Sequence, residues 1–202
     1  MFLEREVANP NQGSSEYGQI ALWQAAADRQ KGIVKMILER GDVNPNQVPT
    51  GYSCTPLSIA ALKRCEGVVK MLLEREDVNP NIADTDDGRT PLSQAASQGC
   101  EGIVKMLLEC GDVNPNQVPK GYDCTPLSIA VLNKNEGVVK LFLEREDVDP
   151  NIADTDDGCS PLVHATRRGY VGIVKMLLER NDIRIDIQDN ENQTPLSLAL
   201  TL

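Results

Sequence analysis

A short sequence, Thr-Pro-Leu or Ser-Pro-Leu, returns along this chain at a nearly fixed interval of 35 residues, shortened to 34 at the last step. Its first residues are Thr55, Thr90, Thr125, Ser160 and Thr194, and Ile20 marks the corresponding place near the start of the chain. A fixed period of this size indicates a repeat architecture, in which each unit packs mainly against its two neighbours. We therefore expect one elongated array, although 202 residues would also suffice for one or two globular domains.

Each unit is expected to form two short antiparallel helices, and residues 90–109 show the pattern best. Thr90 offers a side-chain oxygen to the free amides of a helix start, and Pro91 suits the first helical position, which predicts a first helix of about two turns. Gly99 suits the left-handed conformation that ends a helix. Apolar residues then recur at three- and four-residue spacing over 103–108, which predicts a second helix with a broad apolar face.

The repeats divide the chain into a single domain of complete and partial units. The complete units are expected at residues 20–54, 55–89, 90–124, 125–159 and 160–193. Residues 1–19 match the end of a unit and its loop, since residues 1–11 resemble residues 142–151, and residues 194–202 supply a first helix alone. Terminal repeats normally carry a polar outer face, which neither end shows. We therefore expect the chain to be a segment of a longer array.

Net charge and hydropathy argue against two classes of partner. The formal charge is −10, from 20 basic and 30 acidic residues, and no run of Lys or Arg offers a surface for nucleic-acid phosphates. The apolar run at 103–108 is interrupted by Lys and falls far short of a bilayer span. Residues 1–11 lack the basic region and apolar core of a secretory signal. We expect no nucleic-acid partner and no membrane insertion.

The cysteines form neither a CxxC motif nor a Cys/His spacing typical of metal sites. They are Cys54, Cys65, Cys100, Cys110, Cys124 and Cys159. Cysteines in one repeat column would lie about 8–10 Å apart in stacked units, too far for a disulfide. We expect free thiols, no metal, no cofactor and a reducing compartment, which is the cytoplasm or alternatively the nucleus.

The acidic loops have three interpretations. Asp84, Asp86 and Asp87 before Gly88 faintly resemble a calcium loop, but no Glu follows where calcium takes a bidentate ligand. A turn in which Asp and Gly accept the required backbone angles is the preferred interpretation. An acidic rim that steers a basic partner, with binding weakened by salt, is the remaining alternative.

Nothing in the sequence indicates catalysis. His164 is the only histidine, and no GxSxG motif or phosphate-binding loop is present. Because His164 occupies the column of Gln94, we expect an exposed side chain on a first helix. Lys105 and Glu109, with their equivalents in the other units, are expected to form surface pairs four residues apart. We therefore expect no enzymatic activity.

The unit resembles the ankyrin repeat along nearly the whole chain. Thr55–Ala61 and Thr90–Ala96 match the start Thr-Pro-Leu-His-x-Ala-Ala, with Ser in place of His, and Asp-Val-Asn follows at 42–44, 77–79 and 112–114. The loops are longer than is usual in the family. The resemblance implies an all-α solenoid of stacked antiparallel helix pairs joined by β-hairpin-like loops, with a concave face of hairpin tips and first helices that binds proteins. In style the loops look like those of fungal receptor-type ankyrin proteins.

Residues 44–109 and 114–179 are nearly identical, and most of their differences fall at the end of the first helix and in the turn that follows. A surface that varies on a constant scaffold is typical of recognition, and neutral drift at exposed positions is the alternative. With nearby loop residues, these columns supply the candidate partner-binding residues. They are Thr50, Tyr52, Ser53, Lys63, Arg64, Cys65, Arg89, Gln94, Ser97, Gln98, Lys120, Tyr122, Asp123, Asn133, Lys134, Asn135, His164, Arg167 and Arg168.

The predicted function is non-catalytic binding of a protein partner through the concave face, as the scaffold or sensor part of a larger protein. The alternative is an elastic spacer without a specific ligand. In a third interpretation the array is itself a substrate, because its Asp-Val-Asn motifs, with Asn44, Asn79 and Asn114, resemble those hydroxylated in other ankyrin proteins.

Overall fold

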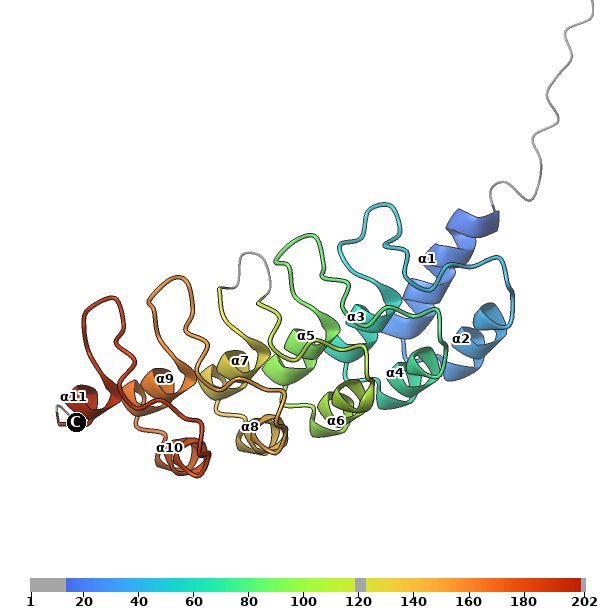
Figure 1. The fold of residues 1–202 in the computed structure, drawn as a ribbon. Helices are drawn as coiled ribbons and strands as arrows, with labels where there is room; N and C mark the ends of the chain where they lie inside the picture. The colour runs from blue at the N-terminus through green and yellow to red at the C-terminus, as the bar shows by residue number, and fades with distance from the viewer. Residues whose placement is uncertain (1–13, 119–122, 201–202) are drawn as a thin grey trace, which may run out of the picture.

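The computed structural model describes residues 14–118 and 123–200, and over this part of the chain it contains helices, turns and loops but no β-strand. The helices are α1 (Ser14–Ala27), α2 (Lys31–Leu38), α3 (Pro56–Leu62), α4 (Glu66–Leu73), α5 (Pro91–Ser97), α6 (Glu101–Glu109), α7 (Pro126–Leu132), α8 (Glu136–Leu143), α9 (Pro161–Arg167), α10 (Val171–Leu178) and α11 (Pro195–Ala199). Figure 1 shows the odd-numbered helices in one row and the even-numbered helices in another, with long loops projecting on the side of the odd-numbered row. The predicted all-α solenoid is confirmed.

The odd-numbered helices from α3 onward start as predicted. The Thr55 hydroxyl oxygen accepts a hydrogen bond from the backbone N–H of Ser58 at 3.2 Å, and Pro56 occupies the first helical position. At the start of α5, the hydroxyl oxygens of Thr90 and Ser93 lie 3.0 Å apart. The serine that replaces the histidine of the ankyrin pattern therefore bonds to the capping threonine, and the helix start is preserved.

The first helix differs from the prediction. The repeat pattern placed the start of the first complete unit at Ile20, but α1 already begins at Ser14, so the predicted boundary between residues 19 and 20 lies within a helix. The reason is local: no Thr-Pro pair precedes Ile20 to cap a helix there, and no proline interrupts the preceding turns. Of the expected partial unit over residues 1–19, residues 1–13 lie outside the described residues.

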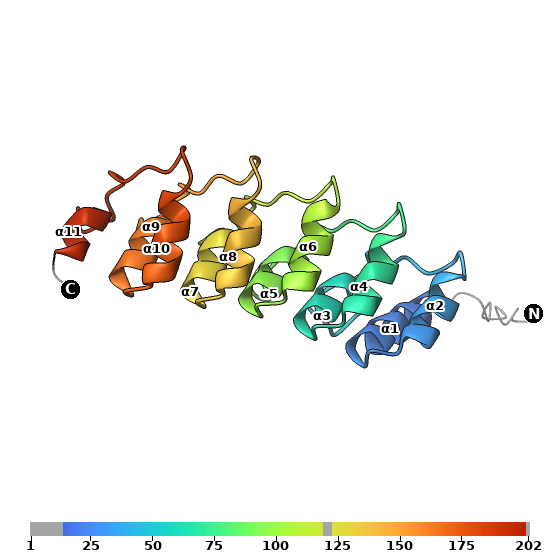
Figure 2. The same cartoon turned by 90° about the horizontal axis from the view of Figure 1, so that it is seen from below.

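The core lies between the two rows of helices. Alanines line the inner face of the odd-numbered helices, and Ala26, Ala60, Ala95, Ala130 and Ala165 are all buried. They allow each odd-numbered helix to pack on the next one, and the larger Leu, Ile and Val side chains of the even-numbered helices fill the space beneath. Figure 2 shows the stacked pairs of helices from below. One continuous apolar cluster therefore joins the units.

Surface pairs form on several of the even-numbered helices. The charged ends of Lys35 and Glu39, of Lys105 and Glu109, and of Lys140 and Glu144 lie 3.9–4.0 Å apart. These side chains are well exposed, so each pair contributes only a few tenths of a kcal/mol, about 0.3–0.5.

Asparagine side chains bridge successive units. The amide nitrogen of Asn116 donates to the carbonyl oxygen of Asp147 at 2.7 Å, and its side-chain oxygen accepts from the backbone N–H of Asp149 at 2.9 Å. The same pair of bonds recurs at the other units. The bridging residues are Asn46, Asn81, Asn116 and Asn151. This asparagine ladder connects the exits of the second helices.

The asparagines proposed as hydroxylation sites have a different role. The side-chain oxygen of Asn44 accepts from the backbone N–H of Asn46 at 2.9 Å, and Asn79 and Asn114 make the same bond two residues ahead. These side chains therefore shape the local turn within their own unit. Hydroxylation of these asparagines stays a prediction.

The turn between the helices of a unit contains a left-handed residue. Gly99 has φ of +66° and Gly169 has φ of +65°, as predicted for a helix-ending glycine. Arg29, Arg64 and Lys134 hold the same place in other units, with φ between +56° and +61°. A side chain in this conformation costs about 1 kcal/mol more than glycine.

Replacing Gly169 by alanine is therefore expected to lower the free energy of unfolding by about 1 kcal/mol. A Cβ at this position would meet no atom within 4 Å, so the loss reports the backbone conformation alone. Gly99→Ala is expected to lower the free energy of unfolding by more than Gly169→Ala does, because the added Cβ would lie 2.8 Å from Oδ1 of Asn135. Urea unfolding followed by circular dichroism measures both losses.

The control for these substitutions is Gly111→Ala. Gly111 also has open space around its Cβ position but lacks a positive φ, so its replacement is expected to change stability by less than about 0.5 kcal/mol. Equal losses at 111 and 169 would contradict the role assigned to the left-handed backbone.

Candidate protein-binding surface

The loops that project beside the odd-numbered helices, together with the C-terminal ends of α3, α5, α7 and α9, form a surface that we call the finger face (Figure 1). The loops before α5 and α9 are stabilised by hydrogen bonds within the loop. Oδ1 of Asp84 accepts from the backbone N–H groups of Asp87 and Arg89 at 3.0 and 3.2 Å, and the N–H of Asp84 donates to the carbonyl of Arg89. Asp154 makes the same turn one pair of units later.

Neighbouring loops are also bonded to one another. The backbone N–H of Thr85 donates to the carbonyl of Ser53 at 2.7 Å, and that of Thr155 donates to the carbonyl of Asp123 at 3.0 Å. Within each of these two pairs of loops, the bond holds the two loops at a defined spacing.

Asp84 acts as a turn residue. Its Oδ1 is used in the turn, and its Oδ2 accepts from the side-chain amide of Gln94 at 3.0 Å. Burial raises the pKa of Asp84 above its ordinary value, and the neighbouring Asp87 adds to this effect. Both oxygens have protein partners, which supports the turn interpretation of this acidic loop over the calcium interpretation.

Many of the predicted binding residues are accessible on the finger face. Those that are exposed are Thr50, Lys63, Arg64, Gln98, Asn133, Lys134 and Arg168. Those that are partly buried are Tyr52, Ser53, Arg89, Ser97, Asp123, Asn135 and Arg167. Lys120 and Tyr122 lie outside the described residues.

Three predicted residues are buried, and the expectation that His164 is exposed is wrong. Cys65 and Gln94 are 5% exposed and His164 is 6% exposed. Gln94 and His164 point from their helices toward the base of the adjacent loop, where they bond to Asp84 and Asp154. A hydrophilic side chain at this place is buried because the loop folds back over the helix, which the helical period alone does not reveal.

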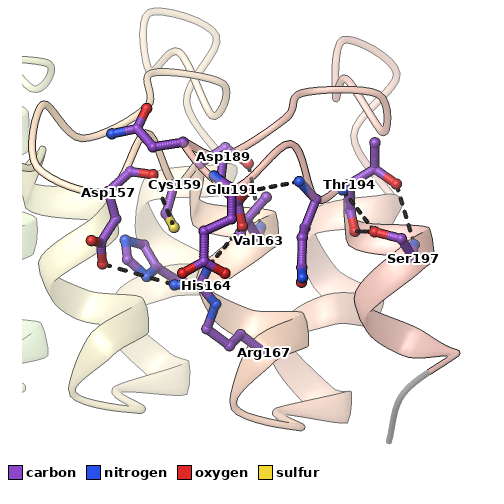
Figure 3. Close-up of polar contacts among 12 residues, drawn as sticks. Asp157, Cys159, Val163, His164, Arg167, Asp189, Glu191, Thr194 and Ser197 are labelled. Carbon is purple, nitrogen blue, oxygen red and sulfur yellow. Dashed lines mark hydrogen bonds and ion pairs between the residues drawn. The ribbon is translucent and has the colours of Figure 1, made fainter.

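Several partly buried members of the set hold the array together. The amide of Asn135 donates to the carbonyl of Ala96 in the preceding unit at 2.8 Å. Arg167 contacts the buried carboxylate of Asp189 at 2.6 Å. Burial opposes ionisation of Asp189, but backbone N–H groups and Arg167 outweigh it and hold its pKa below the ordinary value. Figure 3 shows Arg167 and Asp189 among these contacts.

An aromatic contact near the first loop was not predicted from the sequence. The rings of Trp23 and Tyr52 have centroids 4.1 Å apart, and the indole N–H of Trp23 donates to the carbonyl of Cys54 at 3.0 Å. Trp23 lies in α1, outside the region of the two compared halves, so comparison of the halves gave no signal for it.

Charge is divided along the finger face. Asp86, Asp156 and Asp157 are exposed in the loops, whereas Lys134 and Arg168 are exposed at the helix ends. Between the loops before α7 and α9 is a hollow of about 340 Å³, lined by acidic residues of the loops and by His164 and Arg168. The finger face therefore offers both signs of charge within a short distance.

The cysteines are all free, as predicted. Burial raises the pKa of Cys124 and of Cys159 to about 11, so both thiols are protonated at neutral pH. Within residues 14–118 and 123–200, none of the helices combines the length and the apolar character needed to cross a membrane.

Comparison with known proteins agrees with this architecture. The family model for ankyrin repeats in three copies matches residues 2–84, 22–119, 76–154 and 127–202. A search of curated protein sequences finds no match. Among solved structures, EF0377, an ankyrin repeat protein, has a TM-score of 0.80 and 28% identity, and the match covers 90% of each chain. The ankyrin repeat domain of Bcl-3, a member of the IkappaB protein family, has a TM-score of 0.80 at 23% identity, over 89% of this chain and 78% of that one. Because the family model matches nearly the whole length, the chain belongs to the ankyrin repeat family.

Proposed function

We propose that this chain binds a protein partner through the finger face and serves as a non-catalytic recognition module within a larger scaffold or sensor protein. Ankyrin repeats are generally protein–protein interaction modules. The observation that carries the proposal is the position of the residues that differ between the two similar halves. Three differing pairs are exposed on the finger face in both halves: Lys63 and Asn133, Arg64 and Lys134, and Gln98 and Arg168.

The opposite side of the array, formed by the even-numbered helices, tests whether neutral drift explains these differences. Most exposed residues on the even-numbered helices and directly after them are the same in the two halves, such as Lys70 and Lys140, or Glu74 and Glu144, whereas Glu101 and Val171 differ. Drift at exposed positions would change both sides alike, since surface substitutions on either side alter stability by less than about 0.5 kcal/mol. The concentration of differences on one side supports recognition there.

The charges of the finger face indicate the chemistry of the partner. Acidic loop tips beside basic helix ends suit a partner that also carries both signs, and each misplaced charge then costs affinity. Because the charges are exposed, we expect binding to weaken as salt is raised.

The test is affinity capture from an extract of the source cells, followed by mass spectrometry. The native chain is compared with a face variant that carries Lys63→Ser, Arg64→Asn, Gln98→Ser, Lys134→Asn and Arg168→Ser. Asparagine is used at 64 and 134 because it tolerates the positive φ of these positions. A control variant replaces four exposed lysines of the even-numbered helices by serine, at positions 35, 70, 105 and 140, so that both variants lose the same formal charge.

We expect a protein that is retained by the native chain and the control variant and that binds the face variant at least about tenfold more weakly. Circular dichroism verifies that both variants are folded. Equal retention by all three would reject the finger face as the binding surface, and the absence of any specifically retained protein would favour the spacer.

A further inference from the structure

Three potential metal ligands converge at the base of the loop before α9. One ligand atom each from Asp154, Cys159 and His164 lies within 4.8 Å of the other two. Cys159 is fully buried, and the side chains of Asp154 and His164 are 7% and 8% exposed. Figure 3 shows the sulfur of Cys159 beside the imidazole ring of His164.

The local fold holds these side chains in place from two elements, the loop before α9 and α9 itself. Asp154 lies in the loop, Cys159 immediately precedes the N-cap Ser160, and His164 lies on α9. Oδ1 of Asp154 is occupied by the backbone N–H groups of Asp157 and Cys159, at 2.9 and 3.2 Å. Oδ2 is thereby directed at Nε2 of His164, at 2.6 Å.

The other half of the chain shows what this loop requires for folding alone. There the same positions hold Asp84, Arg89 and Gln94, and Oδ1 of Asp84 makes the same turn. The amide of Gln94 donates to Oδ2 of Asp84 at 3.0 Å, so glutamine is sufficient to join the helix to the loop. The architecture therefore requires neither a cysteine at 159 nor a histidine at 164. The two differences together add a sulfur and a nitrogen ligand beside an existing carboxylate.

We propose that Asp154, Cys159 and His164 bind one Zn²⁺ ion, with water from the adjoining hollow as the fourth ligand. A thiolate, an imidazole and a carboxylate are the three ligand types that zinc takes in proteins, at about 2.0–2.3 Å. Hard cations such as Ca²⁺ and Mg²⁺ prefer oxygen ligands alone, so this mixed set favours zinc over them. Tetrahedral bonds of that length separate ligand atoms by about 3.3–3.8 Å, which small side-chain rotations achieve from the present arrangement. The hollow reaches Asp154 and His164, which gives the ion a path of entry.

Binding requires the loss of one proton. In the hydrogen bond to Asp154, Nε2 of His164 carries the proton, so binding of the ion through Nε2 moves this proton to Nδ1 by way of solvent and the imidazole stays neutral. The Cys159 thiol releases its proton to solvent as the sulfur–zinc bond forms, and the hydrogen bond between Asp154 and His164 is exchanged for two bonds to the ion. Metal binding is accordingly expected to strengthen as pH rises. A bound ion would clamp the loop at 154–159 to α9.

The test uses Co²⁺ as a spectroscopic probe of the zinc site, added to the metal-free chain under a non-metal-binding reductant. We expect one equivalent to give visible d–d bands and a near-ultraviolet thiolate-to-cobalt band, and we expect Zn²⁺ to displace it. The loss-of-site variant is Cys159→Arg with His164→Gln, which copies the residues of the other half and so retains a combination already compatible with the fold. It is expected to remain folded by circular dichroism and to lose both bands.

The matched gain-of-site variant is Arg89→Cys with Gln94→His. It rebuilds the three ligands around Asp84 and is expected to raise the stoichiometry from one to two Co²⁺ ions per chain. The proposal is overturned if the folded native chain gives no thiolate-to-cobalt band. It is equally overturned if the band persists after Cys159→Arg and His164→Gln, because another cysteine would then supply the sulfur.

Discussion

Replacement of Phe142 by alanine is expected to lower the free energy of unfolding by about 3–5 kcal/mol. Phe142 is on α8, is fully buried, and is the largest such side chain within the described residues. Its removal leaves a cavity between units that the stacked helices cannot close without moving several neighbours. Urea unfolding followed by circular dichroism measures the loss, and amide hydrogen exchange reports whether opening is concentrated at α7 to α9, as expected for a quasi-one-dimensional array.

The matched control is Phe142→Leu. Leu72, Leu107 and Leu177 hold the corresponding position in other units, and all are fully buried, so the site accepts leucine geometry. We expect this change to cost less than about 1.5 kcal/mol. A loss for Phe142→Ala no larger than that for Phe142→Leu would mean that the units collapse around the cavity.

Replacement of Asn116 by alanine is expected to cost about 2 kcal/mol, because it removes both bonds of one step in the asparagine ladder. The affected groups are the carbonyl of Asp147 and the N–H of Asp149, in the unit after Asn116. The loss should therefore appear as faster hydrogen exchange at 147–149, beside the lower midpoint of urea unfolding.

Asn114→Ala is the control for the ladder. The side chain of Asn114 accepts the local bond from the N–H of Asn116, and the alanine variant keeps the backbone N–H that Asn114 donates to Asn81, so we expect a loss of about 0.5–1 kcal/mol and no change in exchange at 147–149. If the two alanine variants were equally stable, the inter-unit bonds of Asn116 would be exchanged for water without loss.

Part of the candidate surface was predictable because the two halves of the chain provide an internal comparison. Lys63, Arg64 and Gln98 were named from sequence differences and are exposed as expected. Cys65 and Asn135 differ between the halves for another reason: both are at the junction of two units, where Asn135 bonds to Ala96. A residue that differs between the two halves can therefore lie either on the binding surface or in the contact between units. Both kinds of position accept substitution when the neighbouring residues change as well.

The sequence by itself determined the fold, because the period, the Thr-Pro caps and the apolar spacing act within one unit and are repeated in each. The sequence also predicted the left-handed conformation of Gly99, and the spacing of the cysteines predicted that they form no disulfide. Only the tertiary structure decided which polar side chains are buried, since this depends on loops that return over helices from ten residues away. His164 is the clearest case: its helical column predicted an exposed residue, and the fold of the loop brought it to Asp154 and Cys159 instead. Long-range contacts of this kind depend on the path of the loop, which local periodicity does not specify.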